Sequence, residues 1–256
     1  MKRAITCILI VLSACSPEEA KHKAAGNVLF KQGDLDGAVR EYRAAVQANP
    51  KDANSRTLLG NALFEKEKYD EARTEYQQAL ALDPKARAAM QGLLALELRA
   101  NHPDAARTQL DKMLALDARD PEAHVALGKI LYVKGDLDGA ESHLRNALVY
   151  AQNDPSALYT LGLVLAKKKE LEQANAIFDR LEKATPGKPY APYGRAVAAA
   201  ISGRSDDALK QLAVALERGG VDDVGLVERD EGLAAIRSTP KFAELIAAAK
   251  LRAPSR

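Results

Sequence analysis

The chain has 256 residues, of which 47% are hydrophobic and 28% charged, a balance typical of soluble folds. The formal net charge is only +2, so no global basic charge predicts binding to nucleic acid. Tryptophan is absent and aromatic residues make up 5%, while alanine and leucine are abundant, which favours helices and argues against a β-sandwich.

Residues 1–14 have the pattern of a short export signal. Two basic residues open the segment, an apolar run covers residues 4–12, and two small residues precede Cys15. The apolar run is too short to span a bilayer as a stable helix, which needs about 20 residues. Two alternatives remain: a plain secretory leader followed by an incidental cysteine, or a short buried helix.

The stretch Leu-Ser-Ala-Cys that ends at Cys15 resembles the lipobox of bacterial lipoproteins at all four positions. In that family the signal is cleaved before the cysteine, whose thiol and amine are then acylated. The resemblance implies lipidation of Cys15, with residues 15–18 as a lipidated tether. Acyl chains bury methylene groups at about 0.8 kcal/mol each, so two or three chains would hold the protein stably at a membrane. Ser16 stands where an aspartate is the familiar inner-membrane retention signal, so the resemblance favours the outer membrane.

A unit of 34 residues recurs in phase over residues 19–222. Its six copies start at Glu19, Ala53, Arg87, Pro121, Pro155 and Pro189. One column is alanine in every copy: Ala38, Ala72, Ala106, Ala140, Ala174 and Ala208. An earlier column is glycine in four copies and departs at Leu94 and Ala196, while a large residue follows each alanine by four positions. One such spacing would indicate only an amphipathic helix, but six copies in phase indicate a repeat architecture.

This pattern of small and large residues resembles the tetratricopeptide repeat, a pair of antiparallel helices whose small residues let the two axes approach closely. The resemblance implies an all-α fold, a right-handed superhelical solenoid of six helix pairs. It also implies that the chain holds other proteins.

The phrase Gly-Asp-Leu-Asp-Gly-Ala occurs at residues 33–38 and again at residues 135–140. Gly33 is placed to end one helix, and Asp36 is placed to cap the next by accepting backbone N–H bonds. The Asp-x-Asp-Gly portion also matches part of a calcium loop, but the remaining ligands and the closing glutamate of an EF-hand are missing. We therefore interpret both stretches as a turn and a helix cap.

The sequence differs at the junctions before the fourth and fifth repeats. Asp120 and Asp154 each precede a proline, which predicts a capping aspartate with proline in the first helical turn. After the last repeat, residues 223–256 carry apolar residues without the period, and Thr239 and Pro240 predict the start of a helix. Because an open stack exposes the apolar face of its last repeat, we expect this segment to be a helical cap.

No motif of metal, nucleotide or nucleophilic catalysis occurs in the chain. The histidines, His22, His102, His124 and His143, fall at scattered repeat positions, which does not provide the convergence of a metal site. His124 occupies a first-helix packing position, which predicts a core or rim role. We expect no catalytic residue, metal or cofactor. An enzyme remains a remote alternative, with a site formed by the irregular third repeat and the C-terminal segment.

In the family that the repeats resemble, the first helix of each repeat lines a concave groove. Transferred by position, the partner-binding residues are Lys23, Asn27, Phe30, Asn54, Asn61, Phe64, Gln91, Arg99, Lys129, Tyr132, Tyr159, Tyr190 and Tyr193. Such a groove suits a bound peptide or helix, with aromatic anchors for affinity and amides for register. An alternative is that the column Phe30, Phe64, Leu98 and Tyr132 mainly packs between neighbouring copies.

The carboxylate-clamp subclass of this family, which grips a free chain terminus, is only half matched. Lys23 and Asn27 are present, but Leu58, Ala88 and Gly92 stand where that subclass has an amide and two basic residues. We therefore do not expect recognition of a chain end.

An array of six repeats behind a lipobox also resembles the pilotin lipoproteins of type IV pili. Those proteins assist the assembly or localisation of the secretin, the ring through which the pilus leaves. The resemblance implies a scaffold on the periplasmic face of the outer membrane, with a secretin as partner and the lipid as its membrane contact. An adaptor for cell-wall enzymes or for envelope assembly machinery would use the same groove.

Overall fold

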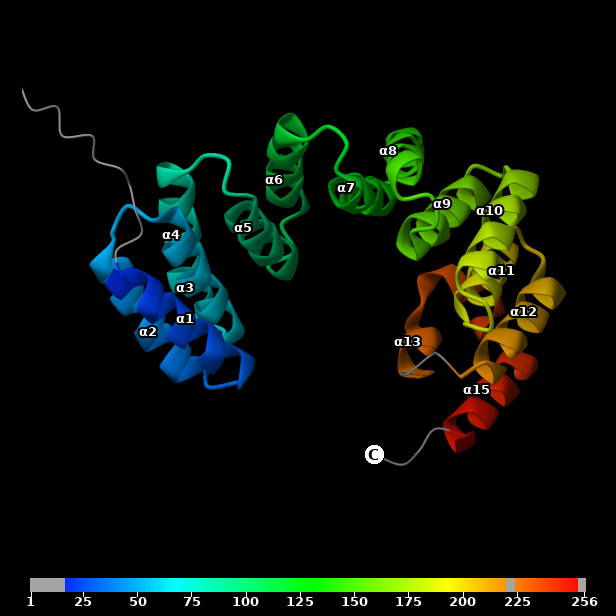
Figure 1. Cartoon of the computed structure of the whole chain (residues 1–256). Helices are drawn as coiled ribbons and strands as arrows, with labels where there is room; N and C mark the ends of the chain where they lie inside the picture. Colours follow the sequence, from blue (N-terminus) through cyan, green and yellow to red (C-terminus); the bar gives the residue numbers. More distant parts are fainter. Residues whose placement is uncertain (1–16, 220–223, 253–256) are drawn as a thin grey trace, which may run out of the picture. The chain divides into compact units, whose positions relative to one another are not determined.

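The computed structural model describes residues 17–219 and 224–252, and most of their helices are labelled in Figure 1. Every regular element in these ranges is a helix, so the predicted all-α fold is confirmed. None of the helices in the described ranges combines the length and hydrophobicity that a membrane span requires. The predicted signal peptide and Cys15 lie outside the described residues.

The chain divides into two compact units, Met1–Gln109 and Leu110–Arg256, each with its own apolar core. The boundary falls inside α6 (Pro103–Leu116). The earlier helices are α1 (Pro17–Lys31), α2 (Leu35–Ala48), α3 (Ala53–Glu65), α4 (Tyr69–Leu82) and α5 (Arg87–Arg99). In this first unit α1 packs against α2 and α3 against α4, while α2 also contacts α3 and α4 contacts α5. It is therefore a series of consecutive helix pairs (Figure 1).

The second unit begins with further helix pairs and ends with a segment of shorter helices and one longer helix. Its paired helices are α7 (Pro121–Lys134), α8 (Leu137–Tyr150), α9 (Pro155–Lys167), α10 (Leu171–Ala184), α11 (Tyr190–Ile201) and α12 (Ser205–Glu217). Shorter elements follow: α13 (Val224–Arg229), the 3-10 helix η1 (Glu231–Leu233), α14 (Ala234–Arg237) and the longer α15 (Pro240–Arg252). Within this unit α9 contacts both α7 and α11, so first helices of successive pairs lie side by side.

Close packing of each pair depends on the small residues of the repeat. Each alanine of the invariant column is fully buried. Tyr76 of α4 lies between two glycines, because a Cβ atom added at Gly60 would come within 2.6 Å of its ring and one added at Gly92 within 2.3 Å. Phe178 of α10 has the same relationship to the glycines of α9 and α11. The missing Cβ atoms therefore make the space that the rings of Tyr76 and Phe178 fill.

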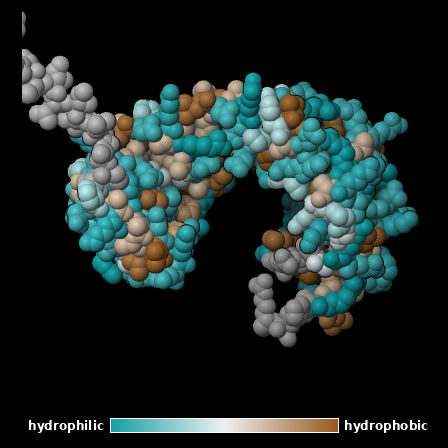
Figure 2. All heavy atoms as spheres, viewed as in Figure 1, coloured by the Kyte–Doolittle hydropathy of each residue, from teal (hydrophilic) through white to brown (hydrophobic). Residues whose placement is uncertain are grey.

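The apolar side chains thus face inward. Figure 2 shows mainly hydrophilic residues on the visible surface of each unit, with the hydrophobic ones in small patches. This is the distribution expected of amphipathic helices that bury one stripe in a shared core.

The irregular third repeat contains a buried carboxylate that is neutralised by an ion pair. Glu97 replaces an apolar residue on α5 and is only 6% exposed. Its carboxylate forms an ion pair with Arg73 of α4 and contacts His102 Nδ1 at 3.2 Å. The hydrogen bond from Arg73 lowers the pKa of Glu97, so the carboxylate stays ionised at neutral pH.

The cap predicted at Asp36 is wrong. Helix α2 begins at Leu35, so Asp34 is the residue before the helix, and its Oδ1 accepts from Gly37 N at 2.8 Å. Asp36 lies one residue inside the helix and instead forms an ion pair with Lys66. The second occurrence of the phrase behaves alike, with Asp136 accepting from Gly139 N at 3.0 Å. Gly33 has φ +80, which confirms its role as the left-handed residue after α1.

The other two predicted caps are confirmed. Asp120 Oδ1 accepts from the main-chain nitrogens of Glu122 at 3.1 Å and Ala123 at 3.2 Å, and Pro121 is the first residue of α7. Asp154 Oδ1 accepts from Ala157 N at 2.7 Å at the start of α9. Proline costs nothing at this position because the N–H it lacks would have no helical partner.

The segment after the last pair belongs to the same core as that pair. Its buried apolar side chains join the cluster that contains Leu212 and Leu216 of α12; they are Val227, Leu233, Ile236, Phe242, Ile246 and Ala249. Thr239 Oγ1 accepts from Phe242 N at 3.2 Å, so α15 begins where the sequence predicts a helix.

Candidate functional site

The first unit presents two asparagines one repeat apart, each held by a tyrosine of the paired helix. The Tyr42 hydroxyl donates to Asn27 Oδ1 at 2.7 Å, and the Tyr76 hydroxyl donates to Asn61 Oδ1 at 2.8 Å. Burial raises the pKa of both phenols, so they remain protonated donors. Each bond therefore occupies the amide oxygen and fixes the orientation of the amide group.

This orientation leaves hydrogen-bond donors for a ligand. Within the described residues neither the Asn27 nor the Asn61 amide nitrogen has an acceptor. Both residues line a pocket of about 300 Å³. The other lining residues are Phe30, Lys31, Tyr42 and Leu58. An NH₂ group held in one direction suits the carbonyl oxygen of a peptide backbone.

The Lys23 amine forms ion pairs with two carboxylates of the same chain. Its Nζ lies 2.6 Å from Glu19 Oε1 and 3.2 Å from Asp52 Oδ2, and Glu19 is buried. Breaking such a pair to bind a ligand would leave a buried carboxylate without its cation, which is costly. The amine is therefore a poor candidate for partner contact.

Near the C-terminal end of α3, Phe64 contacts Tyr69, which also contacts Arg99. Tyr69 is a residue that the sequence did not single out. The rings of Phe64 and Tyr69 meet edge to face with centroids 5.5 Å apart, and the Arg99 guanidinium lies 4.5 Å from the centroid of Tyr69. Tyr69 opens α4, so its position follows from the second helix. Asn54 and Gln91 are both exposed, on α3 and α5 respectively.

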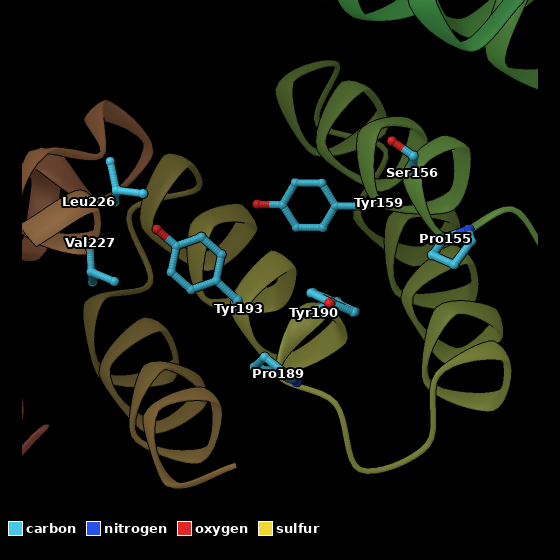
Figure 3. Close-up of a pocket in the computed structure, with 8 residues that line it drawn as sticks. All are labelled: Pro155, Ser156, Tyr159, Pro189, Tyr190, Tyr193, Leu226 and Val227. Carbon is cyan, nitrogen blue, oxygen red and sulfur yellow. The ribbon is translucent and has the colours of Figure 1, made fainter. Parts of the chain in front are cut away.

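The second unit contains a larger pocket of about 540 Å³. Three predicted residues come together in it: Tyr159 from α9, and Tyr190 and Tyr193 from α11. Figure 3 shows these tyrosines with the remaining lining residues, Pro155, Ser156, Pro189, Leu226 and Val227. Leu226 and Val227 belong to α13, so the segment beyond the repeats forms one wall of the pocket.

Tyr193 also contacts a carboxylate that is not itself part of the pocket lining: its hydroxyl donates to Asp230 Oδ2 at 2.5 Å. Burial raises the pKa of Tyr193, and the bond to Asp230 raises it further. Burial also raises the pKa of Tyr159 and of Tyr132, with a smaller contribution from the negative charge of Asp230. All three phenols are therefore neutral at neutral pH and close enough to sense the same carboxylate.

Tyr132 has a different neighbour on its ring face. Lys167 Nζ, from the end of α9, lies 4.3 Å from the centroid of the Tyr132 ring. This is a cation–π contact across two consecutive first helices. Lys129, one turn earlier on α7, is exposed.

Two histidines that the sequence left scattered meet in the second unit. His124 Nδ1 lies 2.9 Å from His143 Nδ1, and His124 Nε2 lies 3.2 Å from the main-chain oxygen of Ala118. His124 is buried, as expected of its packing position. Across residues 17–219 and 224–252, no three metal-ligating side chains converge.

Sequence reasoning missed Leu226, Val227 and Asp230 as site residues. It placed all three in a capping segment, where apolar residues are explained by packing alone. The period that locates groove positions ends before them, so only tertiary contact brings them to the tyrosines.

The family model described as "Tetratricopeptide repeat" matches residues 23–89, 93–157, 134–189 and 159–223. No curated protein sequence matches the chain significantly.

Several solved structures share the fold at low identity. YrrB, described as a tetratricopeptide repeat protein with an unusual peptide-binding site, is 22% identical with a TM-score of 0.59, over 82% of this chain and 97% of that one. PilF of Pseudomonas aeruginosa is 17% identical with a TM-score of 0.65, over 89% and 97%. PilW, described as a widely conserved type IV pilus biogenesis factor, is 18% identical with a TM-score of 0.65, over 85% and 97%.

The family matches cover more than half of the chain and run through both compact units. Helix pairs, buried alanines and glycines under large side chains supply the physical basis of the same assignment. Members of this family are generally non-enzymatic scaffolds for protein interaction. The chain belongs to the tetratricopeptide repeat family.

Proposed function

We propose that this chain is a lipid-anchored scaffold on the periplasmic face of the outer membrane, which binds a segment of a partner protein. The observation that carries the binding role is the repeated bond from Tyr42 to Asn27 and from Tyr76 to Asn61. Equivalent amides one repeat apart offer donors in register to an extended backbone. The aromatic pocket of the second unit supplies apolar anchoring.

The anchor rests on the lipobox that ends at Cys15. A basic start, an apolar run, small residues and a cysteine occur in the order that acylation requires. Because the first described helix begins at Pro17, little chain separates the cysteine from the first repeat. Binding would then take place close to the membrane surface.

The finer proposal is that the partner is a secretin and the chain a pilotin of type IV pili. Its support is the combination of lipobox and repeats, together with likeness in fold to the pilus biogenesis factor PilW. The identity of the bound partner distinguishes this role from that of an envelope adaptor.

The test is crosslinking of the lipidated protein in envelope membranes, followed by purification and identification of bound proteins. The parallel variant carries Asn27→Ala and Asn61→Ala. Its control is Asn146→Ala, which changes an exposed asparagine on the second helix α8.

Recovery of a secretin by the wild type and the control, with loss in the double variant, supports the pilotin role. Recovery of cell-wall enzymes or envelope assembly proteins with the same dependence on the two asparagines favours the adaptor role. Equal recovery by all three proteins would contradict partner binding at these asparagines.

A further inference from the structure

The carboxylate of Asp230 has two hydrogen-bond donors but no ion pair among the described residues. Its Oδ2 accepts from the Tyr193 hydroxyl and its Oδ1 accepts from Gly232 N at 2.8 Å. Among the described residues no lysine, arginine or histidine forms an ion pair with it. Arg237 is nearby but donates to the main-chain oxygen of Asp230, at 2.9 Å, and its ion pair is with Glu231.

The surroundings of this carboxylate are aromatic and apolar. Tyr193 connects it directly to the pocket, whose walls include the tyrosine rings and the α13 residues Leu226 and Val227. In Figure 3 the hydroxyl ends of Tyr159 and Tyr193 both point toward the side on which Leu226 lies. The pocket therefore has a largely apolar lining, and the Tyr193 hydroxyl links that lining to the Asp230 carboxylate.

A long basic side chain matches this combination. The methylene stems of lysine and arginine bury well against apolar surface while the charged head seeks polar partners. Tyrosine rings attract cations through their faces, and a carboxylate beside them adds a charge-assisted hydrogen bond. The same neighbourhood already holds one ammonium group on a ring, that of Lys167 on Tyr132.

We propose that the pocket between α9, α11 and α13 binds a lysine or arginine side chain of the partner, with Asp230 and the Tyr193 hydroxyl recognising its charge. This inference rests on the proposed scaffold function and specifies the chemistry of the bound segment. An acidic segment is repelled by Asp230, and a wholly apolar one leaves the carboxylate without a cation.

The experiment selects peptides from a phage-displayed library of random linear sequences on the purified wild-type protein and on the Asp230→Asn variant. Asparagine at this position still accepts from Gly232 N, so the local turn is retained. The matched control is Glu231→Gln, which removes one negative charge from the next residue. Thermal unfolding followed by circular dichroism verifies that all three proteins are folded.

The wild type should enrich peptides with a lysine or arginine at one position, and Asp230→Asn should lose that preference. The best peptide should bind Asp230→Asn about tenfold more weakly than wild type. Added salt should weaken wild-type binding more than variant binding, since only the former uses the charge. Replacing the basic residue by norleucine should cost a similar factor on wild type and little on Asp230→Asn.

Three outcomes would overturn the inference: enriched peptides without a basic residue, equal affinity for wild type and Asp230→Asn, or no enrichment at all. Envelope crosslinking tests the scaffold function independently of this pocket. If envelope crosslinking still recovers a partner that depends on Asn27 and Asn61, the scaffold function stands and only the basic-residue pocket is refuted. If crosslinking also recovers nothing, the scaffold function fails.

Discussion

The Tyr193 hydroxyl lies 2.5 Å from Asp230 Oδ2. Tyr193 belongs to α11, the first helix of the sixth repeat, whereas Asp230 belongs to the segment that follows the repeats. This bond ties the non-repeating segment to the aromatic pocket, and α13 completes the pocket with Leu226 and Val227. The segment therefore covers the final apolar face and also shapes a candidate binding site.

Tyr193→Phe should destabilise the second unit by about 1–3 kcal/mol, because it removes a hydrogen bond to a charged acceptor and keeps the ring. Denaturant unfolding of the purified chain measures the change. Tyr190→Phe is the matched control, since Tyr190 is 47% exposed and its hydroxyl has no hydrogen bond within the described part of the chain. Equal stability of the two variants would show that the bond to Asp230 contributes nothing.

Gly60→Ala should destabilise the first unit by about 1–3 kcal/mol. The new Cβ atom would lie 2.6 Å from the Tyr76 ring, and overpacking of this kind outweighs the helix propensity gained by alanine. Thermal unfolding measures the loss, with Asn54→Ala at an exposed position of the same helix as control. A variant as stable as the control would mean that the two helices do not need the glycine.

The corrected helix cap can be tested directly. Asp34→Ala should cost about 1 kcal/mol of stability, because it leaves Gly37 N without its acceptor. Asp36→Ala removes only an exposed ion pair and should cost less. Urea unfolding of both variants distinguishes the two assignments, and a larger loss at Asp36 would restore the cap expected from the sequence.

Alkaline pH should weaken the second unit. Burial raises the pKa of Tyr159 and Tyr193 above the ordinary value of 10.0, so the neutral phenols favour the folded state. Their contribution is fully present below pH 10.0 and is lost as the pH rises above it, because the unfolded chain then releases protons that the folded chain retains. The unfolding midpoint in urea should fall above that pH.

The control for this prediction replaces both Tyr159 and Tyr193 by phenylalanine. That variant should lose much of the alkaline decline, since it has no buried phenols at these two positions to ionise. An alkaline decline of the same size in both proteins would assign it to other groups.

Cys15→Ala should move the protein from the membrane fraction to the soluble fraction and leave its helical circular dichroism unchanged. Without the acyl chains the anchoring free energy, about 0.8 kcal/mol for each buried methylene, is absent. Cys7→Ala is the matched control, because Cys7 lies in the predicted signal and should not affect anchoring. An unchanged membrane fraction for Cys15→Ala would contradict the lipoprotein proposal.

The sequence predicted the helical fold well because packing repeats with the period. Ala72 and Gly60 recur in phase with their counterparts, and the resemblance of this pattern to the tetratricopeptide repeat predicted where paired helices approach closely. The capping aspartates before Pro121 and Pro155 were equally readable, since cap chemistry is local.

The contacts of the candidate site were harder to predict from the sequence because they do not follow the repeat period. Nothing in the repeat places Asp230 beside Tyr193, and Tyr69 reaches Arg99 from a second helix that the groove pattern leaves out. Lys23 matched a groove position, but buried Glu19 and the carboxylate of Asp52 hold its amine inside the fold. Such competing local partners become visible only in the tertiary structure.

Site-specific photocrosslinking can show whether this repeat array binds a partner segment at its aromatic pocket. A photoreactive phenylalanine analogue replaces Tyr190, which is exposed on the pocket wall, and the control replaces exposed Asn146 on α8. One partner protein should be crosslinked from position 190 in envelope membranes and not from position 146. Crosslinking from position 146 alone, or from neither position, would contradict it.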